Sequence, residues 1–146
     1  MSLQDWEKNG WLKAHRSSRK ELADLFSIVS RDLKDAAAGG ISEDWKFGIA
    51  YNAALKLCTI LLHASGYKAE HTLQHYRPIQ AMPLILGDQL KVGAQYLDDC
   101  RRKRNKVEYD VAGVASAQDA TELLEFSKEL HANVQDWLKK QRPELL

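Results

Sequence analysis

Apolar residues recur every three or four positions along most of this chain, which is the spacing of amphipathic helices. The pattern Ser18-Arg19-Lys20-Glu21 resembles a capping box, in which the serine and the glutamate side chains bind opposite backbone N–H groups at a helix start. Gly39-Gly40 marks the end of the apolar stripe that follows. The stripe consists of Leu22, Leu25, Phe26, Val29 and Leu33. The sequence therefore predicts a helix from Ser18 to about Gly39.

A second helix is predicted from a Ser42 cap to about Ser65, with Gly66 at the usual C-terminal position. Its apolar residues do not fit on one face, and such a helix is expected at the centre of a bundle. Small residues within it would let neighbouring helices come close. The large residues are Trp45, Phe47, Ile49, Leu55, Leu57, Ile60, Leu61 and Leu62, and the small ones are Gly48, Ala50, Ala53 and Ala54.

The other elements follow from caps and helix breakers. Trp6 to Lys13 is interrupted by Gly10 and predicts partial helix, and the prolines within 70–86 predict one or two short kinked pieces. A long helix is expected from Gly87-Asp88 to about Tyr109. A last helix follows a box-like cap at Ser116 to Asp119. The last stripe, the most regular of the chain, consists of Ala120, Leu123, Leu124, Leu130, Val134, Trp137 and Leu138.

No stretch alternates convincingly with the period of two that marks a half-buried strand, and we find no repeat or linker. The sequence therefore predicts an all-α fold: an antiparallel up-and-down bundle of four to five main helices. At 146 residues the chain is expected to form one domain over residues 1–146, with a core from about residue 18 to residue 140.

The long fourth helix changes character towards its end. Leu90, Ala94 and Leu97 lie within one narrow sector of a helix, and Arg101, Arg104 and Glu108 continue that same sector. A stripe that changes from aliphatic to charged residues usually leaves the core and enters a cleft or an interface. The alternative is a solvated helix end whose basic residues complement the C-terminal dipole.

Charge limits the partners that this segment can have. The whole chain has a net charge of +1, which argues against broad electrostatic attraction to nucleic acid or membrane. Residues 98–110 hold five Lys or Arg residues against four Asp or Glu residues, a net of +1. If RNA or a nucleotide binds here, geometry matters more than bulk charge.

Cys58 and Cys100, the two cysteines, lie among helical apolar residues and are expected to be buried thiols. The N-terminal residues contain no apolar signal core, and no apolar run approaches a membrane span. We therefore expect a cytoplasmic protein without a membrane partner.

The sequence predicts neither a metal site nor a cofactor. It lacks a phosphate-binding glycine loop, paired cysteines and the Glu-x-x-His pairs of di-iron bundles. His71 and His75 can face the same way if 70–77 is helical, but no third ligand is visible, so they are interpreted as surface or interface residues. His63 and His131 are interpreted as satisfied core residues, and His15 has no context.

The segment Arg104-Asn105-x-x-x-Tyr109 has residues suited to a phosphate ligand. An Arg side chain can bind a phosphate through two parallel hydrogen bonds. The amide of Asn105 can donate and accept hydrogen bonds, so it can hold either the Arg104 side chain or a ribose in position. Tyr109 lies about one and a half turns beyond Arg104 and within reach of a shared ligand if the helix bends or two subunits meet. We therefore take Arg101, Arg104, Asn105 and Tyr109 as candidate ligand-binding residues, with Arg104 and Tyr109 as candidate catalytic residues.

Between about Arg19 and Leu138 the chain resembles the HEPN (higher eukaryote and prokaryote nucleotide-binding) domains. The resemblance lies in the helix that ends near Arg31-Asp32-Leu33, in Ala50-Tyr51-Asn52-Ala53-Ala54, in the turn Ala64-Ser65-Gly66-Tyr67 and in Arg104-Asn105 before a long last helix. It implies a helical bundle that commonly forms homodimers, with the late motifs of two subunits facing one cleft. Members with an Arg and a His separated by four to six residues are metal-independent endoribonucleases. Others pair with small nucleotidyltransferases in toxin–antitoxin systems, or bind nucleotides or proteins.

Tyr109 stands where the catalytic members have that histidine. An unperturbed Tyr has a pKa of ~10, so only ~0.1% is phenolate at pH 7. We therefore expect a non-catalytic domain that binds RNA, a nucleotide or a partner such as a small nucleotidyltransferase. One alternative is an active toxin-type endoribonuclease in which Tyr109, His71 or His75 acts as the base. Another is a structural protein that shares only the fold.

Overall fold

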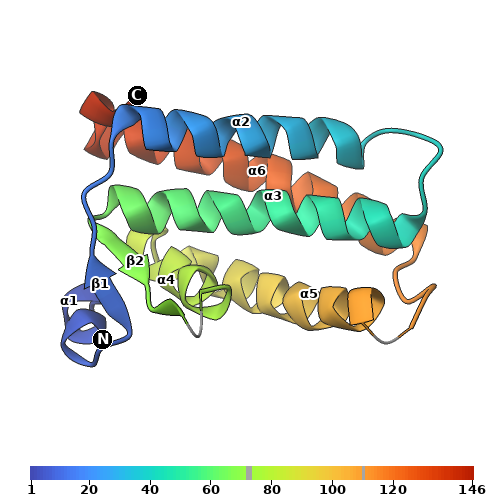
Figure 1. Ribbon diagram of the computed structural model, residues 1–146, viewed down its shortest axis with the longest axis horizontal. Coiled ribbons are helices and arrows are strands. Elements are labelled where there is room, and N and C mark those ends of the chain that lie inside the picture. The colour runs from blue at the N-terminus through green and yellow to red at the C-terminus, as the bar shows by residue number, and fades with distance from the viewer. Residues whose placement is uncertain (72–73, 110) are drawn as a thin grey trace.

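Four long helices of alternating direction and one shorter helix form the body of the protein in the computed structural model (Figure 1). The structure describes residues 1–71, 74–109 and 111–146, with the side chains of Glu108 and Tyr109 excepted. The helices are α1 (Leu3–Lys8), α2 (Arg19–Ala36), α3 (Glu43–Ala64), α4 (Tyr76–Leu86), α5 (Lys91–Tyr109) and α6 (Ala117–Gln141), with 3-10 turns at Asp88–Leu90 and Pro143–Leu145. The predicted all-α bundle with four to five main helices is confirmed.

The central helix is α3, as its apolar circumference predicts. In Figure 1 it lies between α2 and α5, with α6 behind. Most of its large side chains are almost completely buried, among them Phe47, Leu57, Ile60 and Leu61, but Trp45 in its first turn is 64% exposed. By length and composition α3 could cross a membrane, but two-thirds of its most apolar window is buried inside the protein. Its hydrophobicity is that of a helix at the core of a bundle.

The helix starts also agree with the sequence. Ser18, Ser42 and Ser116 each accept a hydrogen bond from the backbone N–H three residues on. Ser116 and Asp119 form the complete reciprocal box. Gly66 ends α3 with a φ of +97°, a conformation that side chains disfavour. Short polar residues thus set where three of the long helices begin.

A two-stranded antiparallel sheet was not predicted. The strand β1 (Leu12–Ala14) pairs with β2 (Tyr67–Ala69), with Leu12 opposite Ala69 and Ala14 opposite Tyr67. Three residues are too few to show an alternating pattern, so the lack of a period-two signal in the sequence did not reveal this pair. The pairing holds the N-terminal segment against the end of α3.

His71 and His75 were expected to face the same way only if 70–77 formed a helix, and the described residues of this segment do not form one continuous helix. α4 begins only at Tyr76, with His75 at its N-cap, and residues 72 and 73 lie outside the described residues. Pro83 lies inside α4, and Pro78 lies in its first turns, where a missing N–H costs little. The two histidines therefore do not share the face of one helix.

Close helix contact occurs at only some of the small residues of α3. The Ser127 hydroxyl on α6 donates to the Ala50 carbonyl at 3.1 Å, and both residues are buried, which places the two backbones side by side. A Cβ on Gly48, by contrast, would meet no atom within 4 Å. Gly48 is therefore not required for close packing, contrary to the sequence interpretation.

Ala50→Leu is expected to destabilise the protein by about 1–3 kcal/mol, because extra methylenes at a filled α3–α6 contact force the helices apart. Gly48→Ala is the matched control and should stabilise it by about 0.5–1 kcal/mol through helix propensity. Urea unfolding followed by circular dichroism measures both changes. Equal effects of the two substitutions would contradict this assignment of the α3–α6 contact.

Candidate functional site

The charged end of the α5 stripe turns towards the protein. Ala94 and Leu97 are buried, and the next residues of that sector, Arg101 and Arg104, are half-buried. The side chain of Arg101 is 24% exposed, whereas that of its neighbour Arg102 is 59% exposed. The interpretation as a solvated helix end therefore fits Arg102 and Lys106, but not Arg101 and Arg104.

A buried carboxylate orients the first of these arginines. Asp98 is 6% exposed. Its Oδ1 accepts from Arg101 Nε at 2.8 Å, and its Oδ2 accepts from Arg102 Nη2 at 2.9 Å. Arg102 also donates to Asp99 at 3.1 Å. Because Asp98 binds the Nε edge of Arg101, the guanidinium is fixed in direction while its other N–H groups point away from that carboxylate.

Each half-buried arginine lies against an aromatic ring. Arg101 Cζ is 5.6 Å from the ring centroid of Tyr76, and Arg104 Cζ is 5.7 Å from that of Tyr51. These are cation–π distances. A guanidinium above a ring still directs its N–H groups outward in its own plane, where an anion can accept them. The rings come from α4 and α3, so three helices meet at this site.

Tyr51 contributes an unusual hydroxyl group. The residue is 1% exposed, and its oxygen has no hydrogen-bond partner among the described residues. Burial raises the pKa of Tyr51 well above its usual range, although the positive charges of Arg101 and Arg104 act in the opposite direction. The hydroxyl therefore stays protonated and lies within electrostatic reach of both arginines.

Asn105 is half-buried on the same helix, and the side chain of Tyr109 lies outside the described residues. His75 is close to the site, because its ring centroid is 6.4 Å from that of Tyr51. Sequence reasoning did not single out Asp98, Tyr51 or Tyr76 as site residues. Their role depends on which helices meet. Only Asp98 gave a local signal, because it precedes Arg101 by three residues and Arg102 by four, the spacing of side-chain pairs on a helix.

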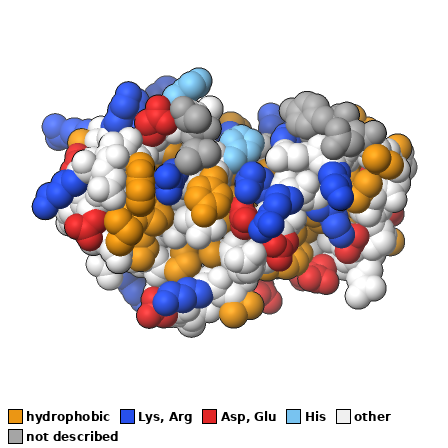
Figure 2. All heavy atoms as spheres, turned by 90° about the horizontal axis from the view of Figure 1, so that it is seen from below, with side chains coloured by type: hydrophobic (Ala, Val, Ile, Leu, Met, Phe, Trp, Pro, Cys, Tyr) orange, Lys and Arg blue, Asp and Glu red, His pale blue; other side chains and the backbone are white. Residues whose placement is uncertain are grey.

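In Figure 2 basic side chains gather on the face that carries α5, with acidic side chains interspersed.

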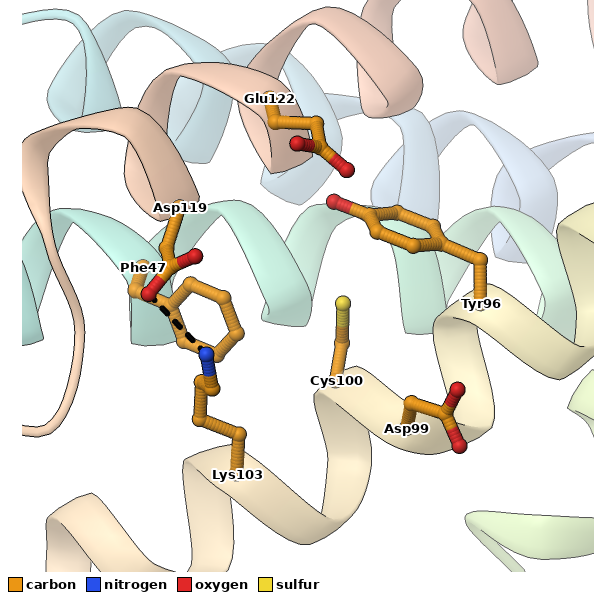
Figure 3. A pocket seen from close by; sticks show the side chains of 7 residues that line it. All are labelled: Phe47, Tyr96, Asp99, Cys100, Lys103, Asp119 and Glu122. Atoms are coloured by element: carbon orange, nitrogen blue, oxygen red, sulfur yellow. Dashed lines mark hydrogen bonds and ion pairs between the residues drawn. The ribbon is translucent and has the colours of Figure 1, made fainter.

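The opposite side of α5 faces α6 and has a different character. A small hollow of about 110 Å³ there is lined by one basic residue, Lys103, and by three acidic ones, Asp99, Asp119 and Glu122 (Figure 3). Lys103 Nζ is 3.0 Å from Asp119 Oδ2. Because the remaining charge is negative, this hollow does not suit a phosphate. The candidate site is therefore on the α3 and α4 side of α5.

Cys100 lines the same hollow, and Cys58 lies in the core. Both thiols are free and buried, as predicted. Burial raises the pKa of Cys58 to about 12 and that of Cys100 to about 11. Neither thiol is thus ionised near neutral pH, and neither is a candidate nucleophile.

The remaining histidines lie away from this site. His63 hydrogen-bonds Glu21 and is satisfied, as predicted, but the same carboxylate also binds His15, for which the sequence gave no role. His131 packs against Phe26, and burial lowers its pKa. Among the described residues, the ligand atoms that lie close enough together to hold a metal ion belong to His15, Glu21 and His63, and not to His71 or His75.

Comparisons with known protein families, characterised proteins and solved structures found no match for this chain.

Tyr51→Phe is expected to raise the free energy of unfolding by about 1 kcal/mol, because it removes a buried hydroxyl that no described group satisfies. Tyr76→Phe is the control and should change it by less than about 0.5 kcal/mol, since Tyr76 is partly exposed. Chemical denaturation of the three proteins tests this. A loss of stability in Tyr51→Phe would show that the hydroxyl is hydrogen-bonded in the folded protein.

Proposed function

We propose that this protein binds the phosphate groups of single-stranded RNA on the α3–α4–α5 face, through Arg101, Arg104 and Asn105, and does not cleave it. The observation that carries the proposal is the pair of half-buried arginines, one turn apart and each against an aromatic ring. Tyr109 is a further candidate ligand-binding residue at this face. No cofactor is required.

Phosphate recognition is supported by the state of the two guanidinium groups. A partly desolvated arginine forms stronger charge-assisted hydrogen bonds than a solvated one. Asp98 neutralises part of the charge of Arg101 and also fixes its direction. With a net charge of +1, the protein has little general attraction for polyanions, so binding depends on these few contacts.

Single-stranded RNA is favoured over a free phosphate because aromatic residues border the arginines. Tyr76 is half-buried and His75 is exposed. Unpaired bases stack on such side chains while the backbone lies on basic groups. A non-catalytic role is also what the HEPN resemblance implies when Tyr replaces the histidine. The homodimer, the nucleotidyltransferase partner and the cytoplasmic location stay predictions.

A metal-independent endoribonuclease is the second candidate, and the position of His75 favours it. His75 is a neighbour of Tyr51, and Tyr51 is a neighbour of Arg104. A histidine titrates near neutral pH and can serve as a general base on a ribose 2′-hydroxyl, which Tyr109 cannot do efficiently.

Arg104→Ala is expected to weaken the binding of a fluorescent single-stranded RNA by about 10–100-fold, because a charge-assisted hydrogen bond contributes about 1.5–3 kcal/mol. The slope of log K against log salt should become shallower by roughly 0.7, because the variant neutralises one phosphate fewer. Fluorescence anisotropy at several salt concentrations measures both quantities.

Lys106→Ala is the control, because it removes one positive charge from an exposed position of α5. It should weaken binding by less than about threefold, as expected for an exposed charge. Equal losses of affinity in the two variants would indicate general charge attraction in place of a defined site. A lower melting temperature of Arg104→Ala without a change in affinity would assign Arg104 a structural role.

Incubation of labelled single-stranded and structured RNA with the protein in excess EDTA should give no cleavage. The general base of the ribonuclease candidate would have to be His75 or Tyr109, so His75→Ala and Tyr109→Phe are tested alongside. Cleavage that disappears in Arg104→Ala and in His75→Ala would establish the ribonuclease and overturn the non-catalytic proposal. Cleavage that persists in both variants would indicate a contaminating nuclease.

A further inference from the structure

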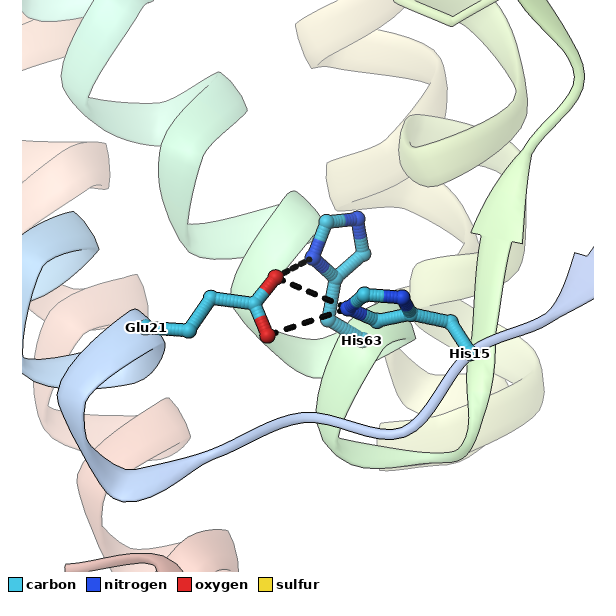
Figure 4. Close-up of side chains that lie close together, drawn as sticks. All are labelled: His15, Glu21 and His63. Atoms are coloured by element: carbon cyan, nitrogen blue, oxygen red, sulfur yellow. Dashed lines mark hydrogen bonds and ion pairs between the residues drawn. The ribbon is translucent and has the colours of Figure 1, made fainter.

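A carboxylate and two imidazoles converge where the N-terminal segment meets the end of α3 (Figure 4). Glu21 Oε1 lies 2.8 Å from His15 Nε2 and 3.0 Å from His63 Nδ1. The second oxygen of Glu21 lies 3.0 Å from His15 Nε2. The ligand atoms of these three residues all lie within 4.8 Å of one another.

Three separate parts of the fold bring these side chains together. His15 follows β1, and its N–H donates to the Gly66 carbonyl at 2.8 Å. Glu21 lies in the first turn of α2, where its N–H donates to the Ser18 hydroxyl at 3.1 Å. The Ser17 hydroxyl donates to the His63 carbonyl in the last turn of α3 at 2.8 Å. Backbone contacts therefore hold all three residues in place.

The use of the Glu21 carboxylate distinguishes this cluster from a helix cap. In a complete capping box the Glu21 carboxylate would accept a hydrogen bond from the backbone N–H of Ser18. Here Ser18 caps the helix alone, and the carboxylate turns to the two imidazoles. The side chains of His15, Glu21 and His63 are 24%, 30% and 18% exposed, so the cluster is sheltered but open to small ions from solvent.

The three side chains offer the kinds of donor atom that zinc prefers. Burial disfavours the charged form of Glu21, but the hydrogen bonds from His15 and His63 outweigh it and lower the pKa of the carboxyl. Burial also lowers the pKa of His63, despite its bond to Glu21. A carboxylate and neutral imidazoles are common zinc ligands.

We propose that His15 Nε2, Glu21 and His63 Nδ1 bind one zinc ion, with water as the fourth ligand. Zinc–ligand bonds of ~2.0–2.1 Å in a tetrahedron place the ligand atoms roughly 3.3 Å apart. The nitrogen–oxygen distances of 2.8–3.0 Å differ from this by only a few tenths of an ångström. The ion takes the place of the N–H groups that face Glu21, and each neutral imidazole carries its proton on the other ring nitrogen. Nitrogen donors favour zinc over calcium or magnesium.

The ion would join the segment after β1 to α2 and α3, so its expected effect is on stability. This site shares no residue with the proposed RNA site, although His63 and His75 line one pocket. His63 lies 12 residues beyond Tyr51 on α3, a distance of about 18 Å along the helix. Loss of zinc binding therefore leaves the RNA proposal untouched, and the reverse also holds.

The test is thermal unfolding of EDTA-treated, dialysed protein titrated with zinc chloride, together with calorimetric titration of the same sample. We expect one ion per chain and a melting temperature raised by about 5–10 °C when free zinc exceeds Kd a hundredfold. In His15→Ala/His63→Ala the affinity should fall at least 100-fold and the thermal shift should disappear. Each variant is compared with its own metal-free melting temperature, so a lower starting stability does not affect the comparison.

His131→Ala is the control, because it removes a half-buried histidine of α6 that lies outside the cluster. It should keep the full zinc response. Cobalt provides a second readout, because four-coordinate cobalt absorbs visible light strongly, and the absorption should be lost in Glu21→Gln. If zinc does not raise the melting temperature, or if only the control variant loses the response, the proposal is overturned and the cluster is a hydrogen-bonded structural contact.

Discussion

Most of the circumference of α3 is apolar, so other helices pack around it and bury most of its length, although Trp45 near its start stays exposed. Its few polar groups must then find partners on those helices, because an unpaired buried group is costly. Asn52 donates to Asp32 of α2 at 2.5 Å, and His63 hydrogen-bonds Glu21 of the same helix. Tyr51 is the exception, with a ring that contacts Arg104 of α5 and a hydroxyl without a described partner. The burial of one helix therefore positions both groups of residues to which we assign chemistry.

The electrostatics of α5 follow from the same arrangement. A basic segment of net charge +1 can recognise an anion only where its positive charges are separated from its negative ones. The fold does this by directing Asp99 and Lys103 towards α6, where Lys103 pairs with Asp119, and the sector of Arg101 and Arg104 towards α3 and α4. Asp98 lies between the two sides and is buried, so it orients Arg101 but is shielded from a ligand in solvent.

Local signals in the sequence predicted the helices, since caps such as Ser42 and stripes spaced by three and four residues depend on near neighbours. The same reasoning placed Arg101 and Arg104 in the sector of α5 that its apolar stripe occupies. It missed β1 and β2, which are stable only because residues more than fifty positions apart pair across three-residue segments. It also assigned Glu21 to a capping box and gave His15 no context. Which side chains meet Glu21 depends on tertiary packing, and spacing along the chain carries no record of it.

The central claim is that the α3–α4–α5 face, and not the acidic α6 side of α5, recognises RNA. An NMR titration of isotope-labelled protein with a short single-stranded RNA in EDTA tests it most directly. We predict shifts in the side-chain guanidinium signals of Arg101 and Arg104 and in the ring signals of Tyr51 and Tyr76, with little change at Cys100 and Glu122. Shifts centred on the α6 side, or no shifts at RNA concentrations well above micromolar, would contradict the account.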